Sequence, residues 1–116
     1  MIFRNPGSLR VFIRPGRTDM RKAINGLNLI IQQEMKQDPF SHSLFVFCGR
    51  SRRLIKLIYW DGNGFCLWQK RLEDGSFPWP GDAMEAMELS REEFLHLLSG
   101  IDFRRRHRIV NFQSVG

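Results

Sequence analysis

The sequence has few of the residues from which metal and redox sites are built. Its 116 residues include two cysteines and three histidines, and no pair of them has the spacing of a zinc ligand set. Cys48 and Cys66 lie inside apolar runs without a CxxC motif, so we expect reduced, buried thiols. We therefore expect no metal ion and no other cofactor.

Long apolar segments are also missing. No run of apolar residues approaches the roughly 18 residues of a membrane span, and the first residues lack the pattern of a secretory signal. We expect a cytoplasmic protein with no membrane partner.

Recognisable catalytic motifs are absent as well. The sequence contains no GxxxxGK[ST] or GxGxxG phosphate loop, and no serine or cysteine has a base at a motif spacing. A metal-dependent nuclease needs convergent carboxylates, for which the candidates are Asp19, Asp61 and Asp102. Each has a local structural explanation, in a first helical turn, a glycine-rich turn and a helix end. We expect a non-catalytic protein and keep a cryptic nuclease as an alternative.

The residues that are present predict a small α+β domain. Residues 9–14 read as a strand stopped by Pro15-Gly16. Apolar residues then recur at steps of three and four, which predicts an amphipathic helix of about five turns. Thr18 or Asp19 is its expected N-cap and Asp38-Pro39 its end. A close approach of the backbone, for example to the sheet, would explain Gly26 inside this helix.

Three further strands are predicted at residues 44–48, 54–60 and 64–70, followed by an edge strand at 86–89. The connections "GRSRR" (residues 49–53) and "DGNG" (residues 61–64) are typical of hairpins. A capping box that starts at Ser90 opens a helix of two to three turns, with Gly100 after its end. We expect one domain over residues 1–102, an antiparallel meander packed against one long helix plus a short C-terminal helix. A basic tail, 103–116, follows and is expected to be partly disordered.

The charge of the chain is large and uneven. The formal net charge is +6, made of +9 in residues 1–72, −7 in residues 73–102 and +4 in residues 103–116. Excess positive charge indicates a polyanionic partner. The simpler interpretation is a solvated loop that keeps apolar strands soluble. The candidate nucleic-acid contacts lie in the first hairpin loop, at the helix start and in the tail: Arg50, Arg52, Arg53, Lys56, Arg21, Lys22, Arg104, Arg105, Arg106 and Arg108.

Three tryptophans accompany these cations. Exposed Trp60, Trp68 or Trp79 would be able to stack on bases. Core positions or a protein interface are the alternatives, because aromatic residues anchor both. We take Trp68 and Trp79 as the candidate residues of a protein interface.

The order of these motifs resembles one known family. The segments "GRTDMRKAINGL", "DPFSHSLFVFCGRSRRLIKLIYWDGNGFCLWQKRLEDGSFPWP" and "LSREEFLHLLSGID" are similar to the small accessory protein of the insertion-sequence-sixty-six group, called TnpB or the second open reading frame. The resemblance covers most of the chain, from about residue 11 to residue 102. It implies a bacterial protein needed for transposition, whose separate transposase carries the metal-binding acids. It supplies no catalytic residue to carry over.

Two functions remain open at this point. The first is an accessory protein that binds the element ends or the target DNA through the basic hairpin, helix start and tail. The second is an adaptor that docks onto the transposase of the same element without touching DNA, for which the aromatic segments and the acidic segment are the motive.

Overall fold

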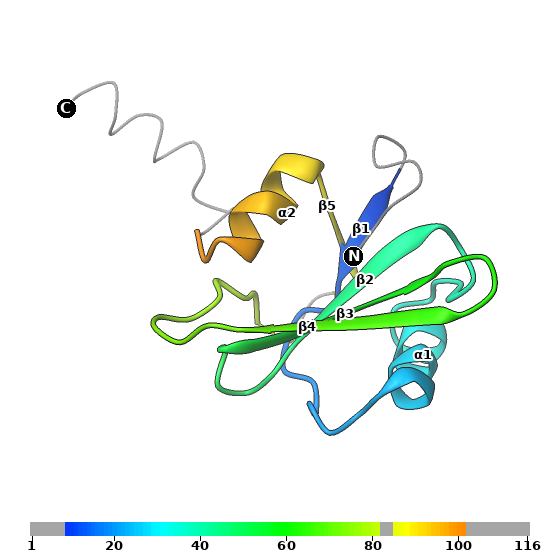
Figure 1. Ribbon diagram of the computed structural model, residues 1–116, viewed down its shortest axis with the longest axis horizontal. Coiled ribbons are helices and arrows are strands. Elements are labelled where there is room, and N and C mark those ends of the chain that lie inside the picture. The colour runs from blue at the N-terminus through cyan, green and yellow to red at the C-terminus, as the bar shows by residue number, and fades with distance from the viewer. Residues whose placement is uncertain (1–8, 82–84, 102–116) are drawn as a thin grey trace.

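A computed structural model describes residues 9–81 and 85–101. A five-stranded sheet in the order β4-β3-β2-β1-β5 forms its centre (Figure 1). The elements are β1 (Arg10–Ile13), α1 (Ile24–Gln33), β2 (Ser43–Cys48), β3 (Leu54–Trp60), β4 (Phe65–Arg71), β5 (Met87–Leu89) and α2 (Arg91–Leu98). The α+β class and the meander β2-β3-β4 are confirmed.

The sheet as a whole is mixed, because a parallel strand pair is added to the antiparallel meander. β1 pairs parallel with β2, with Arg10 opposite Ser43 and Ile13 opposite Val46. Parallel neighbours need a crossover between them, and the segment that contains α1 supplies it. At the edge, β5 returns antiparallel to β1.

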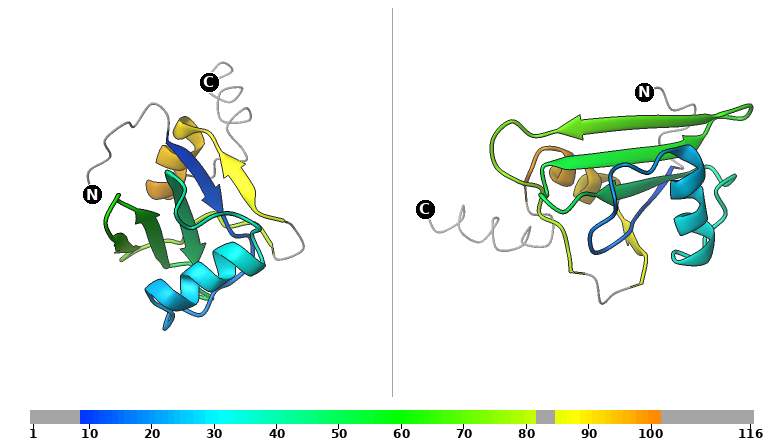
Figure 2. Two further views of the ribbon diagram at one scale, coloured as in Figure 1. Left: turned by 90° about the vertical axis from the view of Figure 1, so that its right-hand side faces the viewer. Right: turned by 90° about the horizontal axis from the view of Figure 1, so that it is seen from below.

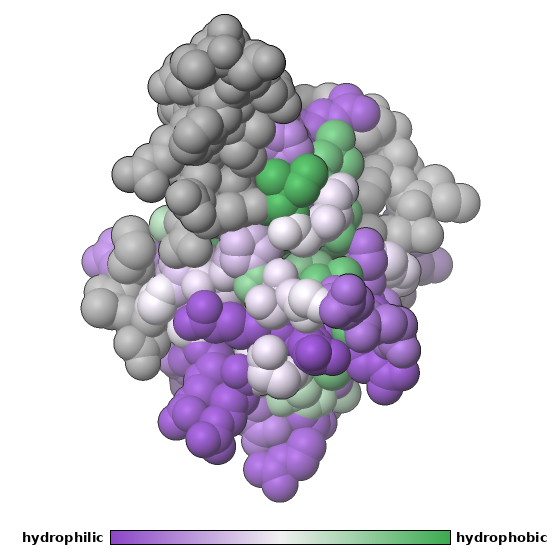
Figure 3. Space-filling model, turned by 90° about the vertical axis from the view of Figure 1, so that its left-hand side faces the viewer, coloured by the Kyte–Doolittle hydropathy of each residue, from purple (hydrophilic) through white to green (hydrophobic). Residues whose placement is uncertain are grey.

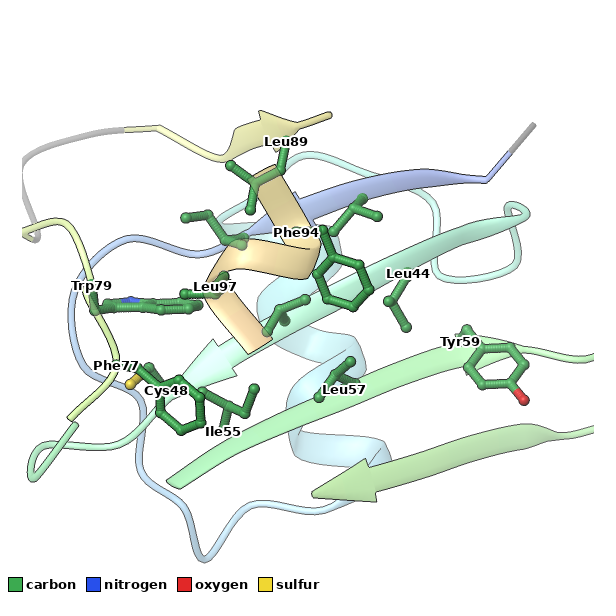
Figure 4. Packing of buried hydrophobic residues seen from close by; sticks show 13 residues of the cluster. Leu44, Cys48, Ile55, Leu57, Tyr59, Phe77, Trp79, Leu89, Phe94 and Leu97 are labelled. Atoms are coloured by element: carbon green, nitrogen blue, oxygen red, sulfur yellow. The ribbon is translucent and has the colours of Figure 1, made fainter. Parts of the chain in front are cut away.

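Each face of the sheet has its own core. On one face Phe12, Phe45, Phe47 and Ile58 pack with Leu27, Ile30, Ile31 and Met35, from α1 and the turn after it. On the other face Leu44, Val46, Ile55 and Leu57 pack with α2 and with Phe77 and Trp79 (Figure 4). α1 and α2 therefore lie on opposite sides of the sheet (Figure 2).

α1 is shorter at both ends than its periodicity predicts. It ends at Gln33 and not at Asp38-Pro39, because Lys36 takes a φ of +57° and the N–H of Gln37 bonds to the carbonyl of Ile31. It begins at Ile24 and has ten residues, with Ala23 at the N-cap and no side-chain cap. The segment before it turns because the carboxylate of Asp19 accepts the backbone N–H of Arg21 at 2.9 Å. Hydrogen bonds of this local kind compete with helix formation. Thr18 is no cap either, since its backbone N–H donates to the carbonyl of Cys48 at 2.8 Å.

Gly26 also differs from expectation. A Cβ at this position would meet the side chain of Lys22, with Cγ at 3.2 Å. The glycine therefore makes room for the aliphatic part of Lys22 and not for the sheet.

The remaining local predictions hold. Ser90 and Glu93 form a complete capping box at the start of α2, and Gly100 after its end has a φ of +79°. In the "DGNG" hairpin Gly62 has a φ of +83°, and the backbone N–H of Asp61 donates to the carbonyl of Gly64 at 2.8 Å. None of the helices in the described ranges is long and apolar enough to cross a membrane.

Candidate nucleic-acid interface at one end of the sheet

Three segments that are far apart in sequence meet at one end of the sheet. They are the turn after β1 (residues 14–18), the β2–β3 loop (residues 49–53) and the segment at residues 77–81. Together they line a shallow cleft of about 470 Å³, whose walls are Gly16, Arg17, Gly49, Arg50, Arg52, Trp79, Pro80 and Gly81. Viewed from this end, hydrophilic residues dominate the lower half of the surface (Figure 3).

Backbone hydrogen bonds fix these segments to one another. The carbonyls of Arg52 and Arg53 accept the N–H groups of Phe77 at 2.6 Å and Leu72 at 2.7 Å. The N–H of Gly16 donates to the carbonyl of Pro80 at 2.9 Å. The cleft is thus held by the scaffold rather than by its exposed side chains.

The side chain of Trp79 joins two of these segments. It is 3% exposed, and its ring points toward Leu97 beside Phe77 and Cys48 (Figure 4). Its indole N–H donates to the carbonyls of Arg14 at 3.0 Å and Gly16 at 2.9 Å. Of the two interface candidates, Trp79 therefore lies in the core, whereas Trp68 lies half-buried on β4.

The arginines of the cleft point to the outside. Arg17, Arg50, Arg52 and Arg53 are exposed. No salt bridge joins any of them to an acid within the described ranges. Arg52 also has a φ of +61°, a region that non-glycine residues visit uncommonly.

Lys56 is placed differently from the other candidates. It is 9% exposed, and its Nζ donates to the carbonyl of Met20 at 2.6 Å and to that of Lys22 at 2.8 Å. It therefore ties the segment before α1 to the middle of the sheet.

Arg21 and Lys22 precede α1 instead of lying in its first turn. The guanidinium of Arg21 pairs with Asp19, with Nη2 2.8 Å from Oδ2. Asp19, Arg21, Arg50 and Ser51 line a second shallow hollow beside the cleft. The four tail arginines, Arg104, Arg105, Arg106 and Arg108, lie outside the described residues.

The Asp19–Arg21 pair predicts a pH effect. Hydrogen bonds from Arg21 lower the pKa of Asp19 from 3.8 to about 2. Because the folded pKa is depressed, the pair is complete above about pH 4 and is lost as the pH falls toward 2. An NMR titration should give a carboxyl midpoint near 2 for Asp19. In Arg21→Gln the midpoint should rise but stay below the ordinary value, because the backbone N–H of residue 21 still donates to the carboxylate; equal midpoints in the parent and the variant would contradict the pairing.

Close packing of Met20 against Gly49 in the β2–β3 loop predicts an effect on stability. A Cβ at Gly49 would lie 2.7 Å from Cγ of Met20, so Gly49→Ala forces that side chain to move. We expect a loss of about 1–3 kcal/mol in the free energy of unfolding, as for other overpacked sites. Met20→Ala should relieve it in the double variant; additive losses in urea denaturation would exclude this contact as the cause.

The two candidate carboxylates that the structure describes, Asp19 and Asp61, lie far apart. Asp19 lies beside Leu54 at the start of β3, whereas Asp61 follows Trp60 at its other end, and a strand of this length spans about 20 Å. Asp102 lies outside the described residues. Within residues 9–81 and 85–101, no three His, Cys, Asp or Glu side chains lie together as metal ligands.

Both cysteines are free. Burial raises the pKa of Cys48 to about 12, so this thiol stays protonated, while Cys66 is half-buried on β4.

Arg17 is the cleft residue missing from the sequence-based candidates. Its signal was the Pro15-Gly16 turn directly before it, which presents the next side chain to solvent.

The comparisons with known proteins identify the family. The model of the IS66 Orf2-like proteins (TnpB_IS66) matches residues 9–108. The chain belongs to the IS66 Orf2-like family. This is a transposition-associated accessory family that is not known to be catalytic.

Relatives of similar length support the assignment. Two uncharacterized proteins of Sinorhizobium fredii (strain NBRC 101917 / NGR234) match. The protein y4hO is 45% identical over 94% of this chain and 95% of its own length. The protein y4jC is 35% identical over 86% of each chain. No solved structure matches the chain.

Proposed function

We propose that this IS66 Orf2-like chain supports transposition by binding DNA through the cleft between Arg17 and the β2–β3 loop. The observation that carries the proposal is a set of exposed arginines that form no salt bridge in the described ranges. Arg17, Arg50 and Arg52 line the cleft, and Arg53 lies beside it in the same loop, where its charge helps to lower the pKa of Glu73. Arginines placed in this way can donate paired hydrogen bonds to phosphate oxygens. The net charge of +6 would draw the chain toward the same polyanion.

The shape of the site favours backbone contact. The cleft is shallow, and its floor is the buried Trp79 with Pro80. Its arginines, Arg17, Arg50 and Arg52, are exposed at its walls. Contacts of this kind position a protein on DNA without reading its sequence. We expect modest discrimination between element ends and random duplex from this cleft.

A gel-shift series across salt concentrations tests the proposal. If four arginines neutralise about four phosphates, log K should fall with log salt with a slope of about −3.6. Arg50→Gln/Arg52→Gln should reduce the slope by about 1.8, at 0.9 for each contact.

The matched control removes two cations elsewhere. Arg10→Gln/Arg91→Gln lowers the net charge equally, and Arg10 loses an exposed pair with Glu88 and its contact over the Phe12 ring. The control should keep the slope of the parent. Equal weakening by both double variants would assign binding to net charge alone, and absence of binding at low salt would refute the proposal.

Docking onto the transposase is the second candidate function. The observation that favours it is an aromatic cluster at the opposite end of β3. The rings of Phe40, Trp60 and Phe65 touch with centroids 4.9–5.2 Å apart, and Phe40 is 55% exposed. Exposed aromatic clusters are common interface anchors. Phe40→Ala should abolish co-purification with the transposase and leave DNA binding unchanged; retained co-purification would argue against this surface.

A further inference from the structure

β4 forms an edge of the sheet with which no other strand in the described ranges pairs. It is the first strand in the sheet order and pairs with β3 residue for residue, from Leu54 opposite Arg71 to Trp60 opposite Phe65. Its seven residues contain no proline and no bulge. Natural edge strands are usually shortened, bulged, charged or covered. Here charge is confined to the last two residues, Lys70 and Arg71.

The register shows which backbone groups face outward. The N–H of Leu72 bonds to the carbonyl of Arg53, and the N–H of Asp61 bonds to that of Gly64. Hydrogen-bonded pairs alternate along an antiparallel ladder, so Cys66, Trp68 and Lys70 bond to β3. The N–H and C=O groups of the alternate residues therefore point away from the sheet: Phe65, Leu67, Gln69 and Arg71. Within the described ranges no second strand pairs with this edge.

We propose that β4 pairs antiparallel with β4 of a second copy of this chain, about a two-fold axis at Trp68. In this register Leu67 bonds to Gln69 of the second copy, and Trp68 faces Trp68. Leu67, which is 36% exposed, then meets Leu67 of the second copy as a diagonal neighbour. The half-buried indole of Trp68 gains a cover on the other face of the sheet.

The charges of β4 favour its own copy. The same register places Lys70 opposite Cys66 and Arg71 opposite Phe65 of the second copy, so no cation faces another. The two Arg71 residues lie about 20 Å apart along the strands. β4 is thus complementary to itself, with its cations facing the uncharged end of the partner strand.

This association is independent of DNA binding, and salt separates the two. The net charge of +6 on each copy opposes pairing, and salt screens that repulsion. The dimer should therefore hold or tighten as salt rises, whereas DNA binding weakens. Loss of one property with retention of the other shows which proposal fails.

Sedimentation of the full chain tests the pairing. Gln69→Pro removes an outward N–H, which edge strands tolerate, and Gln69→Ala keeps it. In the proline variant each copy loses one bond to Leu67 of the other, so the dissociation constant should rise at least about 10-fold. The alanine variant should match the parent. Leu67→Glu, which leaves the backbone unchanged and places two carboxylates beside the axis, should also favour the monomer. A monomeric parent, or a dimer unaffected by Gln69→Pro and Leu67→Glu, would overturn the proposal.

Disulfide trapping tests the axis. In a Cys66→Ser background, Trp68→Cys places two thiols in a directly opposed pair whose Cα atoms lie about 4.5 Å apart, within disulfide range. Oxidation should give a covalent dimer, whereas Arg71→Cys should stay monomeric under the same conditions. Cross-linking through Arg71→Cys, or through another strand in preference to Trp68→Cys, would overturn this register.

Discussion

Replacing Trp79 with alanine is expected to lower the free energy of unfolding by about 3–5 kcal/mol, the range for large aromatic side chains removed from a core. Trp79 is 3% exposed, so the substitution leaves a cavity between the sheet and α2. It also removes the donor that serves the carbonyls of Arg14 and Gly16. Urea denaturation followed by circular dichroism would measure the loss.

Two further variants separate the contributions. Trp79→Phe keeps one aromatic ring and loses the indole donor and part of the buried ring volume, so a smaller loss of about 1–3 kcal/mol is expected. Trp68→Ala removes a half-buried ring from β4 and should cost less than Trp79→Ala. A loss below about 1 kcal/mol for Trp79→Ala, where core truncations cost several times more, would contradict the packing described above. Loss of transposase binding by Trp79→Ala would be informative only under conditions where this variant is still folded.

Local signals account for the parts of the fold that the sequence predicts well. The "DGNG" turn needs a positive φ, which Gly62 provides, and it sets the register of β3 and β4. The box of Ser90 and Glu93 closes on itself within four residues and starts α2 where expected. Each of these features depends on residues that are neighbours in the chain.

Features that depend on distant partners were missed. The parallel pairing of β1 with β2 depends on the path of the crossover, which no local pattern encodes. α1 starts late because the preceding segment has competing partners: the carbonyl of Cys48 for Thr18 and the ammonium of Lys56 for Met20. The apolar periodicity of the helix continues through this segment, so the sequence pattern gives no sign of these competing partners.

The candidate site divides in the same way. Arg50, Arg52 and Arg53 were found because a hairpin loop rich in arginine is conspicuous in the sequence, and they are exposed in the structure. Arg17 joins them because the N–H of Thr18 bonds to the carbonyl of Cys48, directly before the β2–β3 loop, a contact between segments far apart in the sequence. Composition locates the charge, and tertiary hydrogen bonds locate the cleft.

Lys56→Met is expected to lower the free energy of unfolding by about 2–4 kcal/mol, which is a larger effect than a surface lysine can give. Hydrogen bonds to charged groups contribute about 1.5–3 kcal/mol each. Lys56 makes two of them, to the carbonyls of Met20 and Lys22. Relief from burying the ammonium offsets part of the loss. Chemical denaturation measures the change, with Lys70→Met as the control that loses a single bond, to the carbonyl of Leu98.

The DNA-binding behaviour of Lys56→Met decides between structural support and phosphate contact. A lysine that touches phosphate contributes about 0.9 to the salt slope, so its loss would reduce the slope without destabilising the fold. Loss of a lysine that instead holds the segment before α1 would destabilise the fold and leave the salt slope unchanged. Since its ammonium is already bonded to two carbonyls and is 9% exposed, we expect the folded variant to keep both the slope and the affinity of the parent. A stable variant with a reduced slope would return Lys56 to the DNA contacts.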